Sequence, residues 1–304
     1  MSHTLSEKNR LAGVGLALIA VIVWSGNFVV ARGVIHQMPP GTLAFFRWIT
    51  GTVILLPFAW KEVRAHWPAI RKAAGYLFVT ALTGITLFNT LVYVGAHYTT
   101  ATNLALIGTT SSPVMALILA RIFLKERLDR FKLWGLLLCI AGVLFLLARG
   151  NFSNLLSLSF TRGDGWVLLA ALSFAIYNTL ARRKPANIPP LAFLWVIFAL
   201  GTLLLMPVLF WERAHSPAVS WDLSLFWIIL YLGAGTSVIS FLCWNRAIAS
   251  LGAGRTALFG NLIPVFSGLE AAVFLKESFG MVHFVSMILV FAGILLANWK
   301  LFKN

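Results

Sequence analysis

The chain has 304 residues, of which 60% are hydrophobic and only 11% are charged, and its mean hydropathy is +0.88. Soluble domains carry roughly 45–50% apolar and about 25% charged residues, so this composition excludes a soluble globular protein and predicts that most of the chain lies in lipid. The net charge of +15 does not indicate nucleic-acid binding, because the sequence has no basic soluble domain that could hold a nucleic acid.

Ten apolar runs follow one another along the chain, and each is long enough to cross a membrane as a helix. A hydrocarbon core of about 30 Å needs about 20 apolar residues in helical conformation. Strands of a membrane barrel would alternate apolar and polar residues over about 10 positions, and these runs do not alternate. The sequence therefore predicts an all-α membrane protein with ten transmembrane helices. The expected helices lie at approximately residues 11–33, 41–60, 73–93, 101–123, 131–149, 164–183, 190–211, 222–243, 253–275 and 282–300.

The first run follows Lys8 and Arg10, as the apolar core of a signal peptide would. Signal cores extend over only about 7–15 residues and end at a small-residue cleavage site, so we expect a retained helix, because this run continues through Asn27. Most of the 24 lysine and arginine residues fall in segments on the side of the N-terminus. Positively charged loops stay in the cytoplasm, so both termini of this multi-pass protein are expected there, with a bacterial inner or plasma membrane as the expected location.

The second half of the sequence repeats the first at an offset of 150 residues, which becomes 151 after one inserted residue. The matched pairs include Pro40 and Pro190, Thr52 and Thr202, Pro57 and Pro207, Pro113 and Pro264, and the two "FLKE" motifs that end at Glu126 and Glu277. Each half contains an odd number of expected helices, five, so the second half must cross the membrane in the opposite sense. The sequence predicts two domains, residues 1–150 and 151–304, as inverted five-helix repeats. Such repeats are typical of secondary transporters, with a substrate site near the membrane midplane.

The motifs resemble the EamA-type, ten-helix branch of the drug/metabolite transporter superfamily, and the resemblance covers essentially the whole chain. The matching segments are "VIVWSGNFVVARG", "FFRWITGTVILLP", "SSPVMALILARIFLKERL" and "LGAGRTALFGNLIPVFSGLEAAVFLKES". The resemblance implies a metabolite or drug transporter, often an exporter, with a central cavity between the halves. The chain departs from the family near Glu270, where members usually carry an apolar residue, so a generic family mechanism does not account for this carboxylate.

Polar and aromatic residues inside the expected helices recur at matched positions of the two repeats. One stripe begins at Thr86 and continues at spacings of three and four, which place its members on one face of a helix, and its counterpart begins at Ser237. Polar side chains are costly in lipid, so these stripes should face a water-filled cavity, with interhelical hydrogen bonding as the alternative. The predicted substrate-binding residues are Trp24, Asn27, Thr86, Asn89, Tyr93, Thr110, Tyr177, Ser237, Ser240, Trp244 and Asn261.

Arg47 and Glu270 are the charged residues furthest inside the expected helices. Ionisable groups within the membrane are functional candidates by default, so one hypothesis is that the two residues form an ion pair, or that Glu270 exchanges protons with Arg47 nearby and couples transport to protons. A purely structural pair, or an arginine whose side chain reaches back to the membrane surface, is the alternative. Pro113 and Pro264 lie inside the fourth and ninth helices, where each removes a backbone hydrogen bond, and they are predicted hinges.

The expected function is secondary transport of a small organic metabolite, such as an amino acid or a drug-like solute, with export as the expected direction. The alternative is a non-transporting membrane receptor or an accessory of a flippase for lipids or lipid-linked solutes. Enzymatic activity is not expected, because HExxH, GxSxG and intramembrane aspartate clusters are absent, and without a Walker A motif the chain does not drive transport with ATP. The sequence predicts no cofactor, metal site or nucleic-acid partner, and the expected partners are a solute, membrane lipid and, as a hypothesis, protons. The sequence does not determine the oligomeric state.

Overall fold

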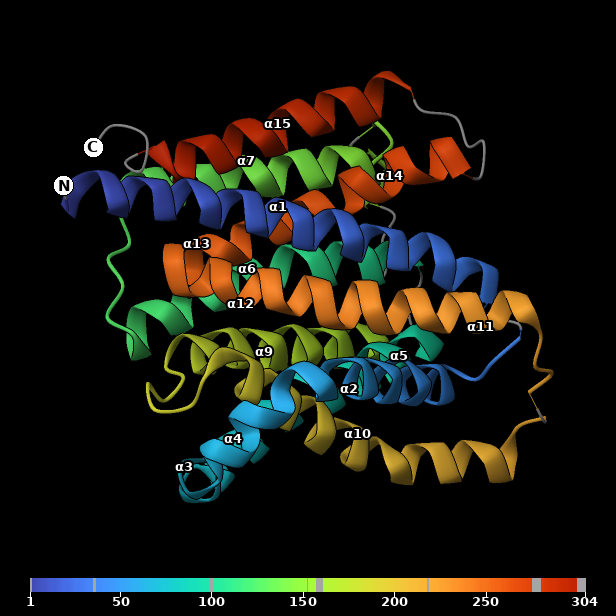
Figure 1. Ribbon diagram of the computed structural model, residues 1–304. Coiled ribbons are helices and arrows are strands. Elements are labelled where there is room, and N and C mark those ends of the chain that lie inside the picture. The colour runs from blue at the N-terminus through green and yellow to red at the C-terminus, as the bar shows by residue number, and fades with distance from the viewer. Residues whose placement is uncertain are drawn as a thin grey trace.

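The computed structural model describes residues 2–34, 37–98, 101–151, 153–156, 161–217, 219–274 and 280–299, and within these ranges it contains helices and no strands. Eight helical segments are long and apolar enough to cross a membrane, and two shorter apolar segments, Thr110–Phe123 and Met281–Ala297, accompany them. Together they fall on the ten predicted runs, which confirms an all-α membrane protein. Figure 1 shows a bundle of long helices with both chain termini at the same end.

The first half of the chain supplies the first five membrane helices. Its elements are α1 (Ser2–Val34), α2 (Pro40–Ala65), α3 (Trp67–Lys72), α4 (Ala74–Ala81), the π-helix η1 (Leu82–Leu87), α5 (Phe88–Tyr98), α6 (Ala101–Phe123) and α7 (Arg130–Leu147), and the short α8 (Ser153–Leu156) follows. The segments α4, η1 and α5 follow each other without interruption, so they form a single third membrane helix.

The second half repeats this order. Its elements are α9 (Arg162–Arg182), α10 (Pro190–His215), α11 (Leu223–Leu230), the π-helix η2 (Tyr231–Ile239), α12 (Ser240–Leu251), α13 (Ala253–Leu258), the 3₁₀ turn η3 (Phe259–Leu262), α14 (Ile263–Phe274) and α15 (Met281–Ala297). The segments α11, η2 and α12 form the eighth membrane helix, and α13, η3 and α14 form the ninth.

Local sequence signals explain where several helices begin. Pro40 and Pro190 occupy the first positions of α2 and α10, where a missing N–H costs nothing because that N–H has no helical partner. Asp129 caps α7 by accepting the backbone N–H of Lys132 at 3.0 Å, and Asp222 caps α11 in the same way. These starts set the depth at which each apolar helix enters the bundle.

The predicted hinges behave differently from each other. The helix α6 continues through Pro113 without a break. The ninth membrane helix changes to the 3₁₀ turn η3 before Pro264, and α14 begins at Ile263. A helix whose next turn contains a proline loses a backbone hydrogen bond, which favours such a change of geometry. The hinge function of both prolines stays a prediction.

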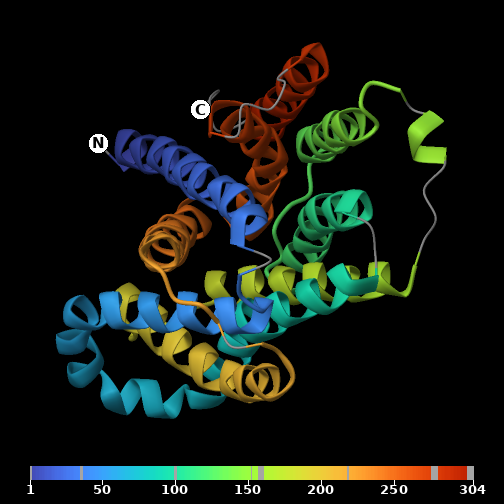
Figure 2. The ribbon, with the colours of Figure 1, turned by 90° about the vertical axis from the view of Figure 1, so that its right-hand side faces the viewer.

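The two halves pack through equivalent pairs of helices. The helix α2 packs on α10, and α7 packs on α15. In addition, α9 packs on α5 and α6, just as α1 packs on α12 and α14. If the two halves are exchanged, the contacts of α9 become those of α1, and the α2–α10 and α7–α15 contacts become themselves. This is expected for a self-complementary interface. Figure 2 shows the α2–α10 pair and the α7–α15 pair on opposite sides of the bundle.

The two pairs of corresponding helices described above, α2–α10 and α7–α15, are both antiparallel. At one end of the α2–α10 pair Gly41 contacts Glu212, and at the other end Ala192 contacts Glu62. In the α7–α15 pair Gly135 packs on Gly293, whereas Gly142, further along α7, packs on Val290, which precedes Gly293 in α15. The two repeats are therefore inverted, as predicted. The domain limits at residues 150 and 151 stay a prediction.

The third and eighth membrane helices both switch to π-helical geometry at matched positions, η1 and η2. A π-helical turn carries one extra residue and changes the direction of its backbone carbonyl groups, and such turns are frequent at functional sites. Both stretches lie against the α2–α10 pair, with η1 on α10 and η2 on α2. The helical irregularities of the two repeats are therefore concentrated at the interface between them.

Candidate functional site

An aromatic cluster fills the middle of the bundle. The rings of Trp24 and Trp244 have centroids 5.0 Å apart, and Phe241 lies 5.5 Å from Trp24. Phe174 stacks on Tyr177 at 5.5 Å and approaches Trp24 edge-on at 6.1 Å. The cluster joins α1, α9 and α12, so it unites the predicted site residues Trp24, Tyr177 and Trp244 from both repeats.

The polar atoms of this cluster's three predicted rings are hydrogen-bonded to neighbouring residues. Trp24 Nε1 donates to the carbonyl oxygen of Thr236 at 2.8 Å, and Trp244 Nε1 donates to Asn178 Oδ1 at 2.8 Å. Asn245 Nδ2 donates to the Tyr177 hydroxyl at 2.6 Å. Sequence reasoning did not place Asn245 among the site residues, although it is a polar residue beside the predicted Trp244.

The cluster is closed in this conformation. Tyr177 and Trp244 expose 0% and 1% of their surface, and Trp24 exposes 9%. Side chains this deeply buried face other side chains, so the predicted lining packs on itself here instead of facing an open central cavity. Two hollows lie at the opposite ends of the bundle, one of about 720 Å³ and one of about 390 Å³.

Arg47 connects α2 to the π-helix η2. Its Nε donates to Ser237 Oγ at 2.9 Å, and its Nη2 lies 3.4 Å from the carbonyl oxygen of Thr236, the group that also accepts from Trp24. The guanidinium carbon lies 5.0 Å from the centre of the Trp48 ring, within the range of a cation–π interaction. Arg47 is buried, so these contacts replace the water that its charge would otherwise require.

Glu270 of α14 lies in a separate polar group formed with α1. Its Oε1 lies 2.7 Å from Ser25 Oγ, and its Oε2 is buried without a hydrogen-bond partner among the described residues. Gly26 makes the room for it, because a Cβ atom there would lie 3.3 Å from Glu270 Oε2 and would collide with the Tyr231 hydroxyl. That hydroxyl donates to the carbonyl oxygen of Val23 at 2.9 Å.

Within the described part of the chain, the predicted direct ion pair between Arg47 and Glu270 is not formed. No Arg47 nitrogen lies within 4.0 Å of the carboxylate there, and Arg47 donates to Ser237 of η2, whereas Glu270 lies beside Ser25 of α1. Tyr231, the first residue of η2, interacts electrostatically with both. The direct pair is absent because the Ser237 hydroxyl and the Thr236 carbonyl oxygen of η2, rather than the Glu270 carboxylate, supply acceptors to Arg47.

The other predicted residues have separate environments. Thr86 Oγ1 donates to the carbonyl oxygen of Gly201 at 3.3 Å, and Asn89 Nδ2 donates to that of Ile85 at 2.5 Å, which are structural contacts with backbone. Asn261 donates to Leu258, and the buried hydroxyl of Ser240 has no partner among the described residues. Asn27 and Thr110 are half-buried. The side chain of Tyr93 lies outside the described residues.

A carboxylate binds each end of the α2–α10 pair, and sequence reasoning missed both of these contacts. Glu212 accepts the backbone N–H groups of Gly41 and Thr42 at 2.8 and 2.6 Å and the Thr42 hydroxyl at 2.9 Å. At the other end Glu62 accepts the N–H of Ala192 at 3.4 Å. The free N–H groups and the positive dipole of a helix start favour a carboxylate there. The offset of 150 residues between Glu62 and Glu212 is the signal that could have revealed the pair.

The EamA-like transporter family matches the chain twice, over residues 11–148 and 161–299. A Bacillus subtilis protein named "Uncharacterized transporter YyaM" is 26% identical over 284 residues, which cover 93% of this chain and 92% of that protein. A Salmonella typhimurium protein named "Probable amino-acid metabolite efflux pump" is 25% identical over 292 residues and covers 92% of both chains. These matches extend over both halves of the chain, and they include the polar groups around Arg47 and around Glu270.

A solved crystal structure shares this architecture. It superposes with a TM-score of 0.79, covering 96% of this chain and 98% of its own, at 17% sequence identity. At that level of identity the likeness concerns the fold alone. It shows that the arrangement of helices described above also occurs in an experimentally determined protein.

Proposed function

Because the chain belongs to the EamA-like transporter family, we propose that it is a secondary transporter that exports a small organic metabolite, such as an amino acid or a drug-like solute. The observation that carries the proposal is the central aromatic cluster with its polar atoms, which is assembled from both inverted repeats and closed to both ends of the bundle. A solute bound at a site that opens first to one side of the membrane and then to the other would pass between these repeats. The name of the Salmonella relative, a probable amino-acid metabolite efflux pump, supports an amino-acid-like solute.

Alternating access would proceed by rocking one repeat against the other. The helices α2 and α10 would support this motion, because Gly51 packs closely on η2 and Gly201 packs closely on η1. The Glu212 clamp closes one end of this pair and the Glu62 clamp the other. Opening one end would release one clamp while the other holds, so the two carboxylates are proposed as equivalent latches.

Glu270 is proposed as the group that couples transport to protons. The Ser25 hydroxyl lies within hydrogen-bond distance of both the Ile22 carbonyl oxygen, at 2.6 Å, and Glu270 Oε1, at 2.7 Å, but it has one proton to donate. If Glu270 carries a proton on Oε1 it can donate to Ser25, and Ser25 can then donate to Ile22. A neutral carboxyl group also reduces the cost of leaving Oε2 buried without a partner.

The proposed topology places both termini and the hollow of about 720 Å³ in the cytoplasm of a bacterium, and the hollow of about 390 Å³ on the outer side. The support is the excess of lysine and arginine in the segments at the end that carries the termini. A solute in the cytoplasm would then enter from the end nearest α6, α9 and α13.

Transport by proteoliposomes tests the proposal. Vesicles that contain the purified protein are loaded with a panel of radiolabelled amino acids, and efflux is measured with and without an inward proton gradient. The expected result is protein-dependent efflux of at least one solute that the gradient accelerates and that Glu270→Gln makes insensitive to the gradient. Asp222→Asn is the matched control, because it removes a carboxylate that only caps α11. Equal efflux from protein-free vesicles for every solute would refute transport of this class.

A further inference from the structure

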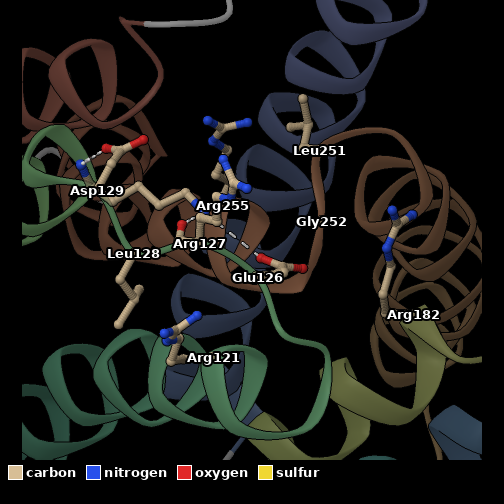
Figure 3. Close-up of a pocket in the computed structure, with 10 residues that line it drawn as sticks. Arg121, Glu126, Arg127, Leu128, Asp129, Arg182, Leu251, Gly252 and Arg255 are labelled. Atoms are coloured by element: carbon tan, nitrogen blue, oxygen red, sulfur yellow. Dashed lines mark hydrogen bonds and ion pairs between the residues drawn. The ribbon is translucent and has the colours of Figure 1, made fainter.

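The larger hollow has a strongly basic lining. It has a volume of about 720 Å³ and lies at the end of the bundle that carries both termini. Its five basic residues come from both repeats, and they are Arg121, Arg127, Lys132, Arg182 and Arg255. Figure 3 shows the arginines around the hollow, from α6, from the segment between α6 and α7, from α9 and from α13. Residues far apart in the sequence therefore bring like charges to one place.

The two carboxylates in the lining are engaged with the protein itself. Glu126 Oε1 accepts the backbone N–H of Ala253 at 3.0 Å, and its Oε2 lies 3.9 Å from Lys132 Nζ. Asp129 accepts the N–H of Lys132 at 3.0 Å as the cap of α7. These carboxylates still attract Arg255, and Arg10 of α1 repels it. The two carboxylates thus hold the walls of the hollow together, and Glu126 lies near the charge of Lys132. The four arginines in the lining outnumber them, so the hollow keeps an excess of positive charge.

Three of the arginines have no acceptor among the residues that the structure describes. Within the described part of the chain, the guanidinium groups of Arg121, Arg127 and Arg255 make no hydrogen bond or ion pair with another residue, whereas Arg182 donates to the carbonyl oxygens of Ile248 and Ala249. Arg255 is half-buried, and its Nε is shielded from water. A shielded N–H without an acceptor is unfavourable, so this site is short of acceptor oxygens.

We propose that the hollow binds the phosphate group of an anionic ligand. A phosphate group presents several acceptor oxygens, and the planar fork of arginine matches their spacing. Basic residues on the cytoplasmic side of a membrane protein also set its orientation. Orientation alone, however, does not require that the arginines converge on one hollow. The group can belong to a soluble phosphate or to the headgroup of an anionic lipid, and both offer the same oxygens.

A bound phosphate group would also connect the two repeats. Arg121 and Arg127 belong to the first half, whereas Arg255 belongs to the second. An anion held by both would stabilise the conformation in which this end of the bundle is assembled around it. This inference does not depend on which solute the protein transports, or on whether transport is coupled to protons.

Binding to the purified, full-length protein tests the proposal. In neutral detergent, inorganic phosphate is titrated at constant ionic strength and binding is followed by calorimetry. In parallel, native mass spectrometry compares retention of phosphatidylglycerol with that of phosphatidylcholine. Loss of one guanidinium group is expected to weaken phosphate-group binding about tenfold in Arg127→Gln and in Arg255→Gln. Arg130→Gln is the matched control, because Arg130 is a neighbouring exposed arginine that lies over the Phe131 ring and is not in the lining.

Each outcome either supports or overturns the proposed phosphate-group site. Binding of inorganic phosphate that both lining variants weaken supports the site and assigns a soluble source. Selective retention of phosphatidylglycerol alone, weakened by the same variants, supports the site and assigns a lipid source. Absence of both, or an equal loss in Arg130→Gln, overturns it. Arg127 is exposed, so Arg127→Gln keeps the test decisive even if Arg255→Gln does not fold.

Discussion

Thr52 and Thr202 occupy the same position in the two repeats, and their hydroxyl oxygens lie 3.3 Å apart. One helical turn earlier, Trp48 and Phe198 form a second pair at the offset of 150, with ring centroids 4.9 Å apart. A residue that touches its own counterpart lies on the pseudo-two-fold axis. The axis therefore passes between α2 and α10.

Gly201→Ala is expected to destabilise the protein by about 1–3 kcal/mol, because an added methyl group overpacks a filled core. A Cβ atom there would lie 2.5 to 2.9 Å from three carbon atoms of Ile85 in η1. The thermal unfolding midpoint of the detergent-solubilised protein measures the effect. Gly165→Ala is the control, since its Cβ atom would meet nothing within 4 Å. The packing argument fails if both variants unfold at the same temperature, or if Gly201→Ala/Ile85→Ala is no more stable than Gly201→Ala.

Glu212→Gln is expected to cost more stability than Glu62→Gln. Glu212 accepts three hydrogen bonds at the start of α2, whereas Glu62 accepts one longer bond at the start of α10. Hydrogen bonds to charged groups contribute about 1.5–3 kcal/mol each, and a glutamine amide can replace only part of this interaction. Chemical denaturation of both variants under the same conditions provides the comparison. An equal loss of stability in the two variants would show that the hydrogen-bond distances do not reflect how strongly each carboxylate stabilises the α2–α10 pair.

Trp24→Phe is expected to lower stability by about 1 kcal/mol, because it removes the Nε1 hydrogen bond to the Thr236 carbonyl oxygen and retains most of the ring. The same variant should impair transport if the cluster contacts the solute. Trp227→Phe is the control, because Trp227 is 58% exposed. Unfolding midpoints and efflux rates are measured for both. Indistinguishable behaviour of the two variants would remove Trp24 from the site.

Cysteine labelling should find Arg127→Cys and Arg213→Cys on opposite faces of the membrane. Both side chains are exposed, Arg127 in the larger hollow and Arg213 in the smaller one at the other end. In a background without Cys139 and Cys243, a membrane-impermeant maleimide is expected to label Arg213→Cys in intact cells and Arg127→Cys only after permeabilisation. Labelling of both from outside would contradict the inverted arrangement, and the reverse pattern would contradict the proposed sidedness.

Sequence patterns predicted the class of the protein and its internal repetition for direct physical reasons. Lipid cannot satisfy backbone polar groups, so each apolar run must form a helix, and ten runs give ten helices. The matched prolines, Pro40 and Pro190, and the matched threonines, Thr52 and Thr202, revealed the repeat. An odd number of helices in each repeat then required inversion, and the antiparallel helix pairs agree with it.

Only the tertiary structure decided which polar groups meet. Arg47 and Glu270 are at similar depths in the sequence pattern, yet Arg47 donates to Ser237 and Glu270 lies beside Ser25. In a helix that is apolar on all sides, periodicity does not reveal which face meets which neighbour. The π-helical turn η2 adds a further element, because it aims the Thr236 carbonyl oxygen at Arg47 and Trp24. Helix count and inversion follow from the solvent and the chain, whereas the partners of each buried charge follow from how the helices pack.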